Sequence, residues 1–108
     1  MFSGLFAVQI IHEQTNLAPF GVPFTVDAFL DINHEEIHRF SLMVRPAGNT
    51  EYMEFPMNYL GSYRYNSQIP GEYMKRQTIE YYLLLELSYG EKITFPEKDA
   101  IYNPIIIQ

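Results

Sequence analysis

Residues 78–89 restrict the fold more than any other part of this chain, because their side chains alternate with a period of two. A strand places alternate side chains on one face, whereas a helix with about 3.6 residues per turn would scatter them around its axis. The segment is therefore predicted to be a long β-strand with one dry face. The large apolar side chains of that face are Ile79, Tyr81, Leu83, Leu85 and Leu87.

Six further segments show the same alternation, and Pro, Gly and Asn gather between several of them, where these residues favour turns. The turns are predicted at 16–23, 46–49 and 58–62. The strands are predicted at 8–13, 24–32, 37–45, 51–57, 63–69 and 92–95. About seven strands at intervals of roughly 8–12 residues predict an all-β domain, an antiparallel sandwich of two sheets. The inward side chains of these strands are predicted to be Phe24, Val26, Ala28, Leu30, Ile32, Phe40, Leu42, Val44, Tyr63, Tyr65, Ser67 and Ile69.

The chain has 108 residues, enough for one domain with its own hydrophobic core. The domain is predicted to span residues 1–108, with its core at about 8–104. Residues 1–7 are interpreted as a lead-in to the first strand or as the remnant of an export signal. Residues 105–108 are interpreted as a tail or a last strand, which pairs with a sheet edge of this chain or of a neighbour.

Charge and composition argue against several classes of partner. The formal net charge is -6, and no cluster of Lys and Arg offsets it, so neither nucleic acid nor an anionic membrane surface is expected to bind. The chain has no cysteine, which removes disulfides, thiolate nucleophiles and cysteine-ligated metals. No apolar run is long enough for a membrane span.

Several short motifs follow one another in order between Ile10 and Pro104. They are Gly21-x-Pro23, the strand and turn Phe40-x-Leu42-x-Val44-Arg45-Pro46-Ala47-Gly48, then Met57, Gly61, Tyr65-x-Ser67-x-Ile69-Pro70, Ile79-Glu80-Tyr81-Tyr82-Leu83, Phe95-Pro96 and Asn103-Pro104. In this order and spacing they resemble the bacterial fibronectin type III and immunoglobulin-like modules. The resemblance implies an immunoglobulin/fibronectin III-like sandwich that serves exported multidomain proteins as an accessory domain without catalysis. The chain departs from the pattern after Ser88, where the acidic residue often found near the strand end is missing, so no calcium or turn role is carried over.

The segment from His34 to His38 reads H-E-x-x-H, the signature of zinc proteases. That chemistry needs a helix of several turns, which places both histidines on one face. Here the segment lies between two predicted strands, and Phe40 and Leu42 follow at once with a period of two. The remaining histidine, His12, lies in the first predicted strand and does not supply an obvious third ligand. The segment is interpreted as a solvated connection, with no metal and no cofactor predicted.

Other catalytic arrangements are also weak in this sequence. The pairs Asp27/Asp31 and Glu80/Glu86 offer the residue types of a glycosidase site. Both pairs lie on outward faces of predicted strands, where charged side chains keep a sheet soluble. The glycines are isolated in turns, and Ser, His and Asp are scattered, so neither a phosphate loop nor a catalytic triad is indicated. The chain is predicted not to be an enzyme.

Six of the nine tyrosines are assigned to two predicted groups. Tyr65 and Tyr81 are placed inside, with hydroxyl groups bonded to the backbone near the strand ends. An outer group offers large contact areas for a polysaccharide, although this chain lacks the Trp that sugar-binding sandwiches commonly use. The outer group consists of Tyr52, Tyr73, Tyr82 and Tyr102.

The leading hypothesis is a non-catalytic interaction or spacer module of an extracytoplasmic bacterial protein or assembly, docking through sheet faces or edge strands. Its expected location is the periplasm, the cell surface or the medium, and its expected partner is a protein or a neighbouring domain. The alternative is a carbohydrate-binding module that uses exposed tyrosines on a polysaccharide. The predicted interaction surface consists of Tyr52, Tyr82, Tyr102, Ile105, Ile106 and Ile107.

Overall fold

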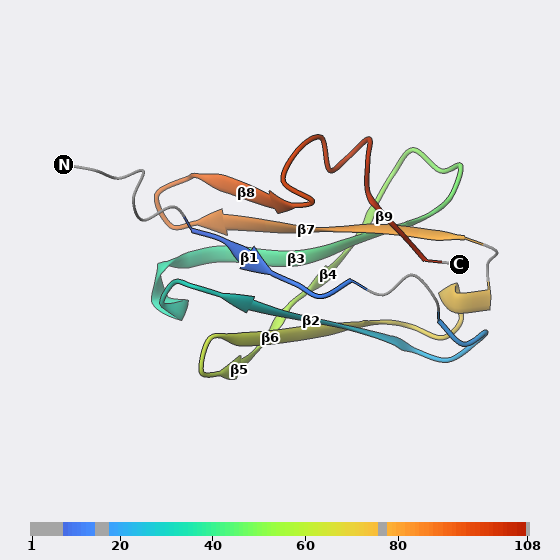
Figure 1. The fold of residues 1–108 in the computed structure, drawn as a ribbon, viewed down its shortest axis with the longest axis horizontal. Coiled ribbons are helices and arrows are strands. Elements are labelled where there is room, and N and C mark those ends of the chain that lie inside the picture. Colours follow the sequence, from blue (N-terminus) through green and yellow to red (C-terminus); the bar gives the residue numbers. More distant parts are fainter. Residues whose placement is uncertain (1–7, 15–17, 76–77, 108) are drawn as a thin grey trace.

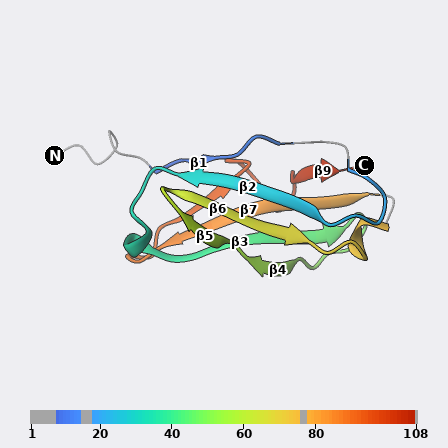
Figure 2. The same ribbon diagram turned by 90° about the horizontal axis from the view of Figure 1, so that it is seen from below.

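A computed structural model describes residues 8–14, 18–75 and 78–107 of the chain. Within these ranges the protein is an antiparallel β-sandwich of two sheets, as predicted from the alternation. Figures 1 and 2 show the long strands β2, β3, β6 and β7 running along the length of the molecule. The nine strands are β1 (Ile10–Ile11), β2 (Phe24–Leu30), β3 (Ile37–Pro46), β4 (Met53–Pro56), β5 (Asn58–Gly61), β6 (Arg64–Ile69), β7 (Ile79–Leu87), β8 (Lys92–Phe95) and β9 (Ile105–Ile107).

The first sheet has the strand order β1-β2-β6-β5. β2 and β6 form its centre and pair over six positions, from Phe24 opposite Ile69 to Phe29 opposite Arg64. β1 pairs with β2 at only two positions, so most of this side of β2 has no neighbouring strand among the described residues. This short edge strand positions the groove described below.

The second sheet has the order β4-β3-β7-β8, and β9 also pairs with β7. β3 pairs with β7 along most of its length, from Ile37 to Pro46. The other side of β7 is shared, because β8 pairs with residues 83–86 and β9 with residues 79–81. Residues 105–107 are therefore the last strand of this chain's own sheet, which was one of the two outcomes expected.

The core lies between the two inner faces, and the period-two prediction places most of it correctly. Val26, Ala28 and Leu30 of β2 are buried, as are all five inward side chains predicted for β7. Ile105 and Ile107 also belong to the core, which extends beyond the predicted limit at residue 104. Since burying one such side chain stabilises a protein by roughly 1.5–3 kcal/mol, β9 is part of the folded domain.

The predicted turn at 58–62 is wrong in its first four residues, which form strand β5. The actual turn consists of two residues, Ser62 and Tyr63, because Gly61 pairs with Arg64. Both turn residues have positive φ angles, 53° and 67°, as a type I′ hairpin turn requires. Tyr63 therefore lies on the hairpin tip and is 49% exposed, rather than facing inward as predicted.

The described residues contain no α-helix, only the short 3₁₀ helices η2 (His34–Glu36) and η3 (Tyr73–Lys75). β1 is also shorter than the predicted 8–13, and β2 ends at Leu30 rather than Ile32. The predicted lead-in at residues 1–7, part of the predicted turn at 16–23 and the last residue lie outside the described ranges.

Candidate functional site

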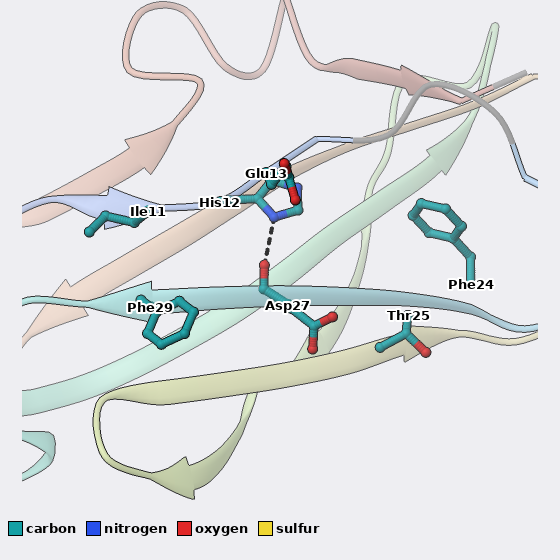
Figure 3. A pocket seen from close by; sticks show the side chains of 7 residues that line it. All are labelled: Ile11, His12, Glu13, Phe24, Thr25, Asp27 and Phe29. Carbon is teal, nitrogen blue, oxygen red and sulfur yellow. Dashed lines mark hydrogen bonds between the residues drawn. The ribbon is translucent and has the colours of Figure 1, made fainter.

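The first sheet carries a groove on its open side, next to the place where β1 ends. Its volume is about 310 Å³. Ile11, on β1, stands directly opposite Phe29, on β2, and both side chains are about half exposed, at 55% and 47%. Figure 3 shows the side chains that line the groove, which are Ile11, His12, Glu13, Phe24, Thr25, Asp27 and Phe29.

His12 follows directly on β1 and links the two sheets through both nitrogen atoms of its ring. Nδ1 lies 2.6 Å from the main-chain oxygen of Asp27 in the first sheet (Figure 3). Nε2 lies 2.7 Å from the hydroxyl oxygen of Tyr81 in the second sheet. Because a carbonyl oxygen only accepts, Nδ1 carries the proton and donates it, and Nε2 accepts the hydroxyl proton of Tyr81. The geometry thereby selects the Nδ1-protonated, neutral imidazole.

Burial lowers the pKa of His12 below its ordinary value of 6.5, although the main-chain oxygen of Asp27 and the carboxylates of Asp27 and Glu13 act in the opposite direction. Burial also raises the pKa of the Tyr81 hydroxyl. Both groups are therefore neutral at pH 7. The basic nitrogen of His12 is occupied by Tyr81, so the contact holds the sheets together and leaves no free acceptor nitrogen on the His12 ring.

A second histidine makes a similar contact at the other end of the first sheet. Nδ1 of His34 lies 3.1 Å from the hydroxyl oxygen of Tyr65, and its ring stacks on Tyr59 with 4.1 Å between the ring centres. Burial raises the pKa of Tyr65 to about 12. Tyr65 and Tyr81 both lie in the core, as predicted, but the prediction that backbone groups bind their hydroxyls is wrong. Histidine side chains bind them instead.

The two histidines of the H-E-x-x-H segment do not share a helical face. His34 begins the single turn of η2, and His38 already lies in β3, so the segment connects two strands as predicted. His12 sits at the edge of the first sheet and is bonded to Tyr81. Within the described ranges, no three side chains of His, Cys, Asp or Glu are grouped so that they could hold a metal ion.

The carboxylates singled out in the sequence take different places. Asp27 is exposed on β2, and Asp31 is exposed just after the end of this strand, where it accepts a hydrogen bond from the main-chain nitrogen of Gln9. Glu80 forms an ion pair of 2.7 Å with Arg45 on the outer face of the second sheet, where both side chains are less than one-fifth exposed. Glu80 is thus a structural partner of Arg45.

The predicted interaction surface is not brought together as one exposed patch. Tyr82 lies on the outer side of β7 but is only 6% exposed, and Ile105 and Ile107 face the core. Tyr52 contacts Tyr82 edge to face. The guanidinium of Arg45 lies 4.4 Å from the centre of the Tyr52 ring. Only Tyr102 and Ile106 are strongly exposed, at 81% and 46%.

No helix in the described part of the chain is long and apolar enough to cross a membrane. Comparison of the sequence with models of known protein families and with curated proteins found no match. The fold and the groove therefore define the class of this protein, a small two-sheet β-sandwich with an open edge groove.

The groove is the feature that the sequence analysis missed. Its residues come from two segments, 11–13 and 24–29, and His12 meets Tyr81 across 69 positions of the chain. The available signal was Phe29, an aromatic side chain on the face of β2 that was otherwise predicted to be polar. It was not used.

Proposed function

We propose that this domain is a non-catalytic interaction or spacer module of an extracytoplasmic bacterial protein or assembly, and that it docks through the edge and outer face of the first sheet. The strand order supports the immunoglobulin-like part of this proposal. In immunoglobulin-type domains the strands A-B-E-D face a sheet containing C, F and G. The order β1-β2-β6-β5 facing β4-β3-β7-β8 corresponds to A-B-E-D facing C′-C-F-G. The bacterial and extracytoplasmic part rests on the sequence resemblance.

The observation that carries the docking role is the exposed apolar pair of Ile11 and Phe29. These two side chains lie opposite one another at the last position of the β1–β2 ladder. Exposed apolar side chains next to an open sheet edge are typical of surfaces that bind other proteins. Phe29 lies beside the groove, which offers a concave surface next to this pair.

The contacts of His12 support a binding role rather than catalysis by this histidine. A general base must reach its substrate with a free acceptor atom, but the acceptor nitrogen of His12 takes the Tyr81 hydroxyl at 2.7 Å. The other ring nitrogen is bound to a main-chain oxygen and not to a carboxylate that would orient it for proton transfer. The side chains that remain available, Phe29, Asp27 and Glu13, are suited to contact.

The docking role is tested by photo-crosslinking. Phe29 is replaced in the full chain by a photoreactive benzoyl-phenylalanine, and the protein is irradiated in an extract of the cells that produce it. The matched control carries the same group at Tyr89, which is 66% exposed in the turn between β7 and β8. We expect one defined covalent product from position 29 and none from position 89.

A second substitution shows that the product reflects the proposed surface. Ile11→Glu places a charge on the exposed partner of Phe29, leaves the core untouched and is expected to remove the product. Equal labelling from positions 29 and 89, or no product from position 29, would overturn the docking proposal. A product that persists in Ile11→Glu would move the contact away from the β1–β2 pair.

A further inference from the structure

We infer that the groove beside β1 and β2 binds a basic and apolar protein segment, with a lysine or arginine side chain lying across Phe29 and against the carboxylate of Asp27. This inference rests on the proposed docking role and names the chemistry of the partner. Figure 3 shows Phe29, Asp27 and Phe24 in this order along β2, with the side chains of Asp27 and Phe24 on opposite sides of the strand and Glu13 beside His12.

Charge is the first argument for a cationic partner. Asp27 and Glu13 line the groove and are both exposed. The two ion pairs found among the described residues, Arg39 with Glu54 and Arg45 with Glu80, lie in the second sheet and leave these carboxylates without a salt-bridge partner there. The chain as a whole carries a formal charge of -6. Arg64, an exposed cation, stands opposite Phe29 on β6. The two carboxylates and the net charge of the chain outweigh this one cation, so the groove favours cations over phosphate groups.

The apolar walls of the groove are the second argument. Phe29 exposes about half of its surface, and Phe24 is partly buried next to Tyr81, with 6.4 Å between the ring centres. A cation over an aromatic face is attracted by the negative charge of the ring face, even at an exposed site. The methylene stems of lysine and arginine also cover apolar surface while their charged ends stay in water. A small metal cation lacks such a stem and would leave Phe29 uncovered.

The size of the groove is the third argument. At about 310 Å³ it is at the lower end of the range for small-molecule sites, which is roughly 300–1,000 Å³. This volume suits one long side chain and a neighbouring apolar one. An exposed Ile11 at its rim then contacts the apolar neighbour, so an alternating basic and apolar segment fits best.

The inference is tested with defined peptides and the ¹⁵N-labelled full chain. The probe is a hexapeptide that alternates valine with lysine. One control peptide carries acetyl-lysine, which keeps the length and removes the charge, and another carries serine in place of valine. We expect the valine–lysine peptide to shift the amide NMR signals of residues 11–13 and 24–29 only. Both control peptides should bind with dissociation constants several-fold higher than that of the valine–lysine peptide.

Substitutions in the protein locate the effect. Asp27→Asn and Phe29→Ser are each expected to weaken binding of the valine–lysine peptide by about 2–5-fold, the range expected for single exposed contacts. Glu51→Gln changes the net charge by the same amount as Asp27→Asn at an exposed position before β4, at the edge of the second sheet opposite β8, and is expected to leave binding unchanged.

Each unfavourable result has a definite meaning. Equal weakening by Glu51→Gln would show that only the net charge of the protein matters, and equal binding of the acetyl-lysine peptide would show that charge does not matter. Either result would overturn the inference. The absence of shifts in the groove would overturn it as well. The crosslinking experiment remains independent, because a product from position 29 without peptide binding keeps the docking role and rejects only a basic partner.

Discussion

Replacing His12 by phenylalanine should destabilise the domain more than its place near the surface suggests. The substitution leaves the Tyr81 hydroxyl, on a residue with 0% exposure, without its hydrogen-bond partner. An unsatisfied buried hydroxyl costs about 1–3 kcal/mol, and the lost bond to the main-chain oxygen of Asp27 adds about 0.5–1.5 kcal/mol. We therefore expect His12→Phe to lower the free energy of unfolding by about 2–4 kcal/mol.

The assay is urea unfolding at a pH well above 6.5, where His12 is neutral in both states. Tyr81→Phe removes the hydroxyl itself, so the double variant with His12→Phe contains no orphaned hydroxyl in the core. The double variant is expected to be more stable than the sum of the two single losses predicts, by about 1 kcal/mol, whereas independent sites add to within about 0.3–0.5 kcal/mol. Additive losses would refute the cross-sheet hydrogen bond as the source of stability.

Three further predictions concern titration, turn strain and the last strand. Burial lowers the pKa of His12 in the folded state, so the unfolded chain takes up the proton first as the pH falls. The contribution of His12 to stability is therefore fully present above pH 6.5 and declines as the pH falls toward the pKa of His12 in the folded state. Unfolding midpoints measured from about pH 7.5 to 5 should therefore fall more steeply for the natural chain than for His12→Phe. Tyr63→Gly, at a φ of 67°, should raise the free energy of unfolding by about 0.5–1 kcal/mol, and Tyr63→Ala, which keeps the strain, should not. Ile107→Ala should cost about 2–5 kcal/mol in urea unfolding, while Ile106→Ala, on the exposed side of β9, should change it by less than about 1 kcal/mol; equal losses would contradict the burial pattern of β9.

Alternation predicted the faces of the strands well, because a half-buried sheet must place every second side chain in the core. Val26 and Leu30 on β2, and Tyr81 on β7, are buried, as their positions in the alternation require. The alternation does not indicate where a strand ends. The pattern was extended through Tyr63 because the hairpin turn uses Ser62 and Tyr63 at positive φ instead of the Asn-Gly that usually marks such a turn.

Features that depend on distant residues could not be predicted from local patterns. The last strand, with three isoleucines in a row, has no alternation from which burial could be assigned, and only its pairing with β7 places Ile105 and Ile107 inside. The hydroxyl partners of Tyr65 and Tyr81 lie 31 and 69 positions away. A histidine at such a distance has no local signature, so both hydroxyls were assigned to the nearer backbone.

The groove combines a residue needed for stability with residues that the fold does not need. His12 lines the groove but also satisfies Tyr81, so its loss disturbs the core and the binding surface together. Asp27 and Phe29 project from the outer face of β2, where their side chains contribute little to the core. An exposed phenylalanine beside a carboxylate that has no salt-bridge partner among the described residues offers little to folding and much to a cationic partner with an apolar stem. Substitution of these two side chains therefore separates binding from stability.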